Sequence, residues 1–164
     1  MALVKPLVLG ANGQIMQISS SDTLNAAVQE ADAITLTNGT TGAIAFGKAV
    51  YISASNSCAL AMANASATKQ VLGLVKDASI AANAVGNIQT DGVITGTTAQ
   101  WDAAIGGSNS GGLTSGAVYY LSATVAGGIT STPPSTTGQY LVPIGVALST
   151  TSLDIRDALF DILL

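Results

Sequence analysis

Two stretches of the chain are nearly the same, Gly47-Lys48-Ala49-Val50-Tyr51-Ile52-Ser53-Ala54 and Gly116-Ala117-Val118-Tyr119-Tyr120-Leu121-Ser122-Ala123. Each is followed by a second apolar run with a central glycine, Gly73 in the first and Gly145 in the second. We interpret them as an internal repeat of a two-strand unit, spanning 47–75 and 116–147. Such a unit cannot bury its apolar face alone, so two of them are expected to pack together. Chance similarity in a chain rich in Gly, Ala and Val is the alternative.

Turn signals divide the rest of the chain into further short strands. Apolar or alternating runs separated by Gly, Asn, Ser and Thr recur from end to end, which is typical of an all-β fold. Turns are expected at Asn38-Gly39, Asp91-Gly92 and Gly127-Gly128. Strands are expected at 6–9, 14–18, 33–37, 49–54, 70–75, 87–90, 92–95, 118–123, 140–148 and 152–155.

The repeat and the turns together predict the fold class. We expect an all-β fold, a small barrel or sandwich built from two similar β units, with one short helix and an extended N-terminal arm. The helix is expected around 99–104, with Thr98 as its N-cap and Gly106-Gly107 as its stop. If the two repeats superpose, Tyr51 and Tyr119 occupy equivalent strand positions.

Both ends of the chain are apolar and are expected to lie against another surface. Residues 1–30 are interpreted as an N-terminal arm or hairpin, 31–157 as the β domain and 158–164 as an apolar C-terminal tail. Pro6 removes a backbone donor, which suits an edge strand or an arm better than a central strand. A free apolar tail would favour aggregation, so truncation after Asp157 should weaken assembly. The interface candidates are Leu3, Val4, Pro6, Leu7, Leu9, Leu159, Phe160, Ile162 and Leu163.

The composition favours a protein that buries surface against other chains. Charged residues make up 9% of the chain and apolar residues 48%, whereas roughly 25% of an average soluble protein is charged. No apolar run approaches the roughly 18 to 20 residues of a transmembrane helix, and the N-terminus lacks the apolar core of a signal peptide. We therefore expect synthesis in the cytoplasm, no membrane partner, and a homo-oligomer that covers the apolar excess.

Several kinds of chemistry are not expected from this residue content. The chain has no histidine and one cysteine, Cys58, which excludes zinc sites built from Cys and His and triads with a histidine base. Its five Lys and Arg residues are scattered, so they make no basic face for nucleic acid. We expect no catalytic residues, no cofactor and no metal, and we interpret Cys58 as a buried, unreactive thiol.

Three patterns resemble functional motifs but have simpler explanations. Residues 42–49 have the glycine and lysine spacing of a phosphate-binding loop, but Ala49 stands where Ser or Thr must bind Mg²⁺. Asp154, Asp157 and Asp161 would share one face of a helix, although a solvated charged face explains them better than a metal site. The sequons that begin at Asn38 and Asn64 are interpreted as ordinary turns.

Longer stretches of the chain resemble structural proteins of tailed bacteriophages. At the start of the chain, the resemblance rests on Lys5-Pro6-Leu7-Val8-Leu9, Gly13, Gln17-Ile18 and Asp22-Thr23-Leu24. The rest of the chain resembles small β-rich capsid decoration (cement) proteins and related tail-fibre modules. This resemblance rests on Gly47, 71–75, 90–94, 112–121 and 142–147. The resemblance covers most of the chain and includes no catalytic signature.

This resemblance implies a virion structural protein without enzymatic activity. Such a protein is a homotrimer that binds the outer surface of the capsid and stabilises contacts between major capsid subunits, so its partners are the major capsid protein and itself. Linked weak contacts on each trimer would then reinforce one another. The alternative is a receptor-binding or tail-fibre module that contacts the host surface.

Overall fold

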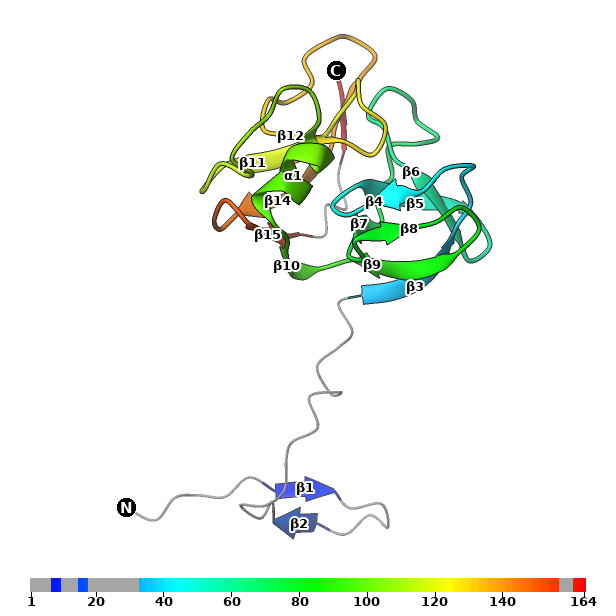
Figure 1. Ribbon diagram of the computed structural model, residues 1–164, viewed down its shortest axis with the longest axis vertical. Helices are drawn as coiled ribbons and strands as arrows, with labels where there is room; N and C mark the ends of the chain where they lie inside the picture. Colours follow the sequence, from blue (N-terminus) through cyan, green and yellow to red (C-terminus); the bar gives the residue numbers. More distant parts are fainter. Residues whose placement is uncertain (1–6, 10–14, 18–32, 157–160) are drawn as a thin grey trace. The chain divides into compact units, whose positions relative to one another are not determined.

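The computed structural model describes residues 7–9, 15–17, 33–156 and 161–164 (Figure 1). The chain divides into two units, residues 1–31 and 32–164. In the first unit, β1 (Leu7–Leu9) pairs antiparallel with β2 (Ile15–Gln17). Strands were expected at 6–9 and 14–18, and the two described strands lie within these ranges; the rest of the expected arm lies outside the described residues.

The second unit begins with a closed five-stranded barrel. Its strands are β3 (Ala33–Asn38), β5 (Ala49–Ala54), β6 (Ser57–Leu60), β7 (Gly73–Val75) and β9 (Val85–Gln89). The order around the barrel is β3-β6-β5-β7-β9, and every neighbouring pair is antiparallel except β3 and β6. A separate pair, β4 (Ile44–Ala45) and β8 (Ser79–Ile80), lies between these strands in the sequence.

An open five-stranded sheet follows the barrel (Figure 1). Its strands are β10 (Gly92–Thr95), β11 (Val118–Leu121), β12 (Ile129–Thr130), β14 (Pro143–Ala147) and β15 (Ser152–Ile155), in the order β10-β15-β14-β11-β12. The helix α1 (Thr98–Ile105) connects β10 to β11. A short pair, β13 (Tyr140–Leu141) and β16 (Ile162–Leu163), completes the fold.

The barrel and the open sheet have the same arrangement of strands. The barrel reads β3-β9-β7-β5-β6 and the sheet reads β10-β15-β14-β11-β12, with each set in the same chain order and with antiparallel pairs throughout both series. The predicted fold class, an all-β protein with barrel and sheet units and one short helix, is therefore confirmed. The barrel additionally closes through the parallel pair β3 and β6.

The register corrects the predicted alignment of the repeats by one residue. Val50 pairs with Gly73, and Tyr119 pairs with Gly145, so Tyr119 is equivalent to Val50. Both side chains are buried, whereas Tyr51 is only partly buried. The expectation that Tyr51 and Tyr119 are equivalent is wrong, because alternate residues on a strand point to opposite faces.

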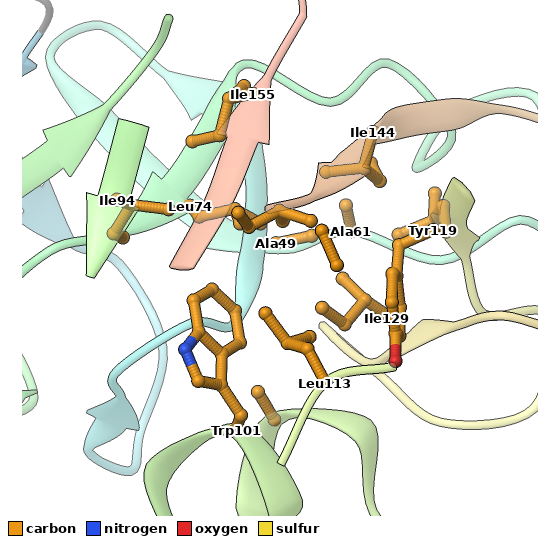
Figure 2. Close-up of a cluster of buried hydrophobic side chains, with 14 of the residues drawn as sticks. Ala49, Ala61, Leu74, Ile94, Trp101, Leu113, Tyr119, Ile129, Ile144 and Ile155 are labelled. Atoms are coloured by element: carbon orange, nitrogen blue, oxygen red, sulfur yellow. The ribbon is translucent and has the colours of Figure 1, made fainter. Parts of the chain in front are cut away.

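Two buried clusters hold the second unit together. The barrel interior contains Leu36, Ile44, Val50, Cys58, Val75, Ile80 and Ile88. The larger cluster lies between the barrel, the open sheet and α1, and Figure 2 shows Trp101, Leu113, Ile129 and Ile144 gathered there against Leu74 and Ala49. Successive residues of β5 and β7 therefore face different clusters, so these two strands are covered on both sides.

The helix begins one residue earlier than predicted. Thr97, and not Thr98, is the N-cap: its hydroxyl accepts from the backbone N–H of Gln100, whose side chain accepts from the Thr97 N–H. Gly106 ends the helix at φ +82°, as its predicted role requires. Trp101 is fully buried, and its indole N–H donates to the carbonyl oxygen of Thr151 at 2.8 Å.

Some short strands were absent from the sequence prediction. These are β4, β6, β8, β12 and β16, and the long strand expected at 140–148 is divided into β13 and β14. Small residues such as Ser57 and Cys58 have weak local β-propensity, and β6 forms because β3 and β5 lie on either side of it. Asn38, expected in a turn, is the fully buried last residue of β3.

Candidate interaction surfaces

The lysine of the phosphate-loop pattern has a structural contact. The Lys48 ammonium group donates to the carbonyl oxygen of Ala104, in the last turn of α1, at 3.2 Å. Partial burial lowers the pKa of Lys48 from its usual value. A cation is favourable beside the unpaired carbonyl groups at a helix C-terminus, so this side chain stabilises the packing of α1 on the barrel.

The three aspartates of the charge pattern do not share a helix. Asp154 lies in β15 and accepts from Arg156, with 3.2 Å between its Oδ2 and the Nε of Arg156. Asp161 forms an ion pair with Lys69, and Asp157 lies outside the described residues. Among the residues that the structure describes, no group of three or more His, Cys, Asp or Glu side chains could hold a metal ion.

The two remaining candidate reactive groups are buried in the barrel. Cys58 has no exposed surface, and burial raises the pKa of its thiol. Asn38 donates from its side-chain amide to the carbonyl oxygens of Gly42 and Ile80, at 2.8 and 2.9 Å, and accepts from the backbone N–H of Thr40. These contacts satisfy a buried polar side chain and stabilise the turn after β3.

The C-terminal interface candidates form a strand on their own chain. Leu163 pairs with Tyr140 and Ile162 with Leu141, and Leu164 exchanges backbone hydrogen bonds with Gly138 and Gln139. Their side chains are exposed to solvent: Ile162 is 50% exposed and Leu163 is 62% exposed. The expectation that this tail docks on another subunit or the capsid stays a prediction, and these residues offer an apolar surface for it.

A cationic contact lies beside the start of this strand. The Lys69 ammonium group pairs with Asp161 and lies 4.3 Å from the centre of the Tyr140 ring. We call Lys69, Tyr140 and Asp161 the C-terminal latch, because they connect both strands of the β13–β16 pair to the segment that precedes β7. Leu7 and Leu9 of the candidate list lie in β1. Leu3, Val4, Pro6, Leu159 and Phe160 lie outside the described residues.

The open sheet has an apolar row that the sequence prediction missed. Val93 pairs with Asp154, Asp154 with Val146, and Val146 with Val118, so these four residues lie side by side across four strands. Their neighbours Ile94, Leu153 and Ala147 point the other way into the larger cluster. Val93 is 50% exposed and Val118 39%. We call Val93, Val146 and Val118 the outer valine row.

Comparison with known proteins does not assign the chain to a family. No protein-family model, no curated protein and no solved structure matches it. In the described part of the chain, no helix has the length and apolar character needed to cross a membrane. The candidate surfaces are therefore interpreted from their own geometry and chemistry.

Proposed function

We propose that this protein is a structural protein of a bacteriophage virion, which binds the outer surface of the capsid and stabilises contacts between major capsid subunits. The observation that carries the proposal is the outer valine row, an apolar sheet face on a chain with only 9% charged residues. Exposed apolar surface of this kind is typical of sites that bind other proteins. The resemblance of the sequence to capsid decoration proteins supports the same assignment.

The proposed mechanism is multivalent binding without catalysis. A homotrimer would present three copies of each apolar surface to a capsid lattice that repeats its own sites. Once one contact forms, the others bind at high effective concentration, so individually weak contacts give a stable complex. The partners are the major capsid protein and further copies of this chain, and the location is the capsid exterior.

The experiment is co-sedimentation of the purified full-length protein with phage heads that lack it. We expect saturable binding at a fixed number of copies per head, and an increase in the temperature at which the heads disassemble. Heads with the sites already occupied serve as the control and should bind no more protein. Absence of binding to vacant heads would contradict the proposal.

A hydroxyl-rich hollow favours the second candidate, a receptor-binding or tail-fibre module. It is lined by Ser122, Ala123, Thr124, Thr130, Thr132, Pro133, Pro134, Ser135, Thr136 and Gln139. Hydroxyl and amide groups suit a polar ligand such as a cell-surface glycan. Saturable binding to host envelope fractions, together with no binding to heads, would assign this function instead.

A further inference from the structure

The pair Asn38-Gly39 is a dipeptide that readily loses its side-chain amide when the chain is unfolded. The backbone nitrogen of Gly39 then attacks the side-chain carbonyl carbon (Cγ) of Asn38, because glycine has no Cβ atom to hinder the approach. A bond forms between this nitrogen and Cγ, and the bond from Cγ to Nδ2 breaks. Nδ2 leaves as ammonia with the proton that the Gly39 nitrogen gives up. Water then opens the resulting ring, which gives aspartate or isoaspartate.

Closure of the barrel keeps both reacting groups from this chemistry. The strands β3 and β6 form the parallel pair, in which Asn38 lies opposite Cys58. The Gly39 N–H donates to the carbonyl oxygen of Cys58 at 2.9 Å, so the attacking nitrogen keeps its proton in a bond to β6. The Asn38 side chain has no exposed surface, so bulk water does not reach its amide. The reaction is therefore blocked while β3 and β6 are paired.

The same amide is needed for the barrel to form. Nδ2 donates to the backbone carbonyl oxygens of Gly42 and Ile80, at 2.8 and 2.9 Å, while Oδ1 accepts from the Thr40 N–H. A carboxylate has no proton for the two carbonyl oxygens, and it would be buried with its negative charge facing them. Isoaspartate in addition lengthens the main chain, at the residue that pairs with Cys58. Both products are therefore incompatible with the native barrel.

We propose that Asn38-Gly39 is a latent deamidation site, which water modifies only after the barrel opens and which then prevents the chain from folding again. Pairing of β3 with β6 preserves the amide, and the amide satisfies the buried carbonyl groups at the end of β3. Loss of the amide turns reversible unfolding into an irreversible step. The inference does not depend on the proposed function, because it concerns only the barrel of a single chain.

The first experiment follows Asn38 by peptide mass spectrometry, at mildly alkaline pH, in native buffer and in guanidinium chloride. The peptide that contains Asn12-Gly13 is the internal reference in denaturant, because it has the same dipeptide sequence. We expect Asn38 to convert at a rate close to that of Asn12 in denaturant, and at least about a hundredfold more slowly in native buffer. Equal rates of Asn38 conversion in the two solutions would overturn the inference.

Refolding after partial conversion tests the second half of the proposal. The denaturant is diluted, and a biotinylated thiol reagent then labels Cys58, which is buried in the native barrel, in chains that have not refolded. Labelled chains are captured, and both fractions are digested. We expect the converted Asn38 peptide only in the labelled chains. Converted peptide in the unlabelled chains, at the proportion found before dilution, would show that the product folds and would overturn the inference.

Two variants separate the amide from other damage in denaturant. Asn38→Asp carries a reaction product from the start, and we expect its Cys58 to be labelled after dilution. Gly39→Ala slows ring formation, and the atom nearest to its added Cβ is the Ser57 hydroxyl oxygen at 2.8 Å, which can rotate away. We expect Gly39→Ala to recover Cys58 protection after an incubation that removes it from most wild-type chains. An Asn38→Asp chain with a protected thiol contradicts the inference, whether or not Gly39→Ala folds.

Discussion

At positions 73 and 145, the neighbouring strand leaves room for glycine but not for a residue with a Cβ atom. In both cases a backbone carbonyl oxygen of that strand lies 2.1 Å from the point where a Cβ atom would be placed. A real Cβ does not come this close to backbone, and the oxygen belongs to a paired strand that cannot rotate away. The two glycines therefore allow the three central strands of each unit to pack at this spacing.

We expect Gly145→Ala to lower the free energy of unfolding by more than about 2 kcal/mol, since backbone must shift to admit the methyl group. Urea denaturation of the full chain measures the change. Gly42→Ala is the control, because nothing lies within 4 Å of its added Cβ, and it should leave the unfolding midpoint nearly unchanged. An equal and small effect of both substitutions would show that the strands can separate without cost.

Lys48 gives the unfolding equilibrium a defined dependence on pH. Burial lowers its pKa in the folded chain below the usual 10.5, which the unfolded chain regains. At a pH between the folded and the unfolded pKa of Lys48, the unfolded chain binds more protons than the folded chain. The free energy of unfolding therefore rises with pH across this range. We expect the stability of wild type relative to Lys48→Met to increase as pH is raised from neutral towards 10.5. A difference that is constant over this range contradicts the prediction.

Cys58 should be unreactive until the barrel opens. The side chain is fully buried, and burial raises the pKa of its thiol, so the reactive thiolate is scarce in the native state. We expect a thiol reagent to modify the native protein far more slowly than the urea-unfolded protein. Equal rates in the two states would show that the barrel opens freely at β6.

At the scale of elements, the C-terminal strand β16 depends on a few polar contacts. Its pairing with β13 spans two residues on each strand, and its apolar side chains are exposed, so burial contributes little to holding it. The C-terminal latch supplies a further contact, with Lys69 only 17% exposed between the carboxylate of Asp161 and the ring of Tyr140. An ion pair of this kind stabilises by up to about 1 kcal/mol.

We expect Lys69→Met to raise the amide hydrogen-exchange rate of Leu164, whose N–H donates to the carbonyl oxygen of Gln139, by about fivefold, which corresponds to ~1 kcal/mol. Lys69→Arg keeps the charge and should retain most of the protection. Exchange in β15 provides the internal reference and should not change. Exchange of β16 that is indifferent to Lys69→Met would mean that backbone pairing alone holds the strand.

Local sequence patterns predicted some of these helices and strands and missed others. Alternating apolar residues predicted β5, β10 and β15, and the capped segment around Trp101 predicted α1, because these signals are local. The strand β6 was missed because its pairing partners, and not its own residues, make it a strand. The outer valine row requires the register of four strands, and no local pattern distinguishes it from the covered row of Ala49 and Leu74.

At the scale of the whole molecule, the outer valine row is apolar, and the one carboxylate within it, that of Asp154, is paired with Arg156. Salt screens interactions between exposed charges but leaves the burial of apolar surface intact. We expect the mass of the wild-type assembly to stay the same, or to increase, between about 0.1 M and about 1 M sodium chloride. Light scattering across this range measures it, and dissociation at high salt would instead indicate a contact held by ion pairs.

The larger buried cluster also bears on how the chain is made. Barrel residues 33–89 leave the ribosome before the open sheet, and their outer side carries Phe46, Ala49 and Leu74, which the sheet and α1 cover later. A nascent chain with a complete barrel therefore displays an apolar side to solvent until translation reaches residue 155. Domains are generally completed in order during synthesis, and apolar surface exposed in the interval promotes aggregation. Slow translation between residues 89 and 155 would prolong that exposure and so favour aggregation of the nascent chain.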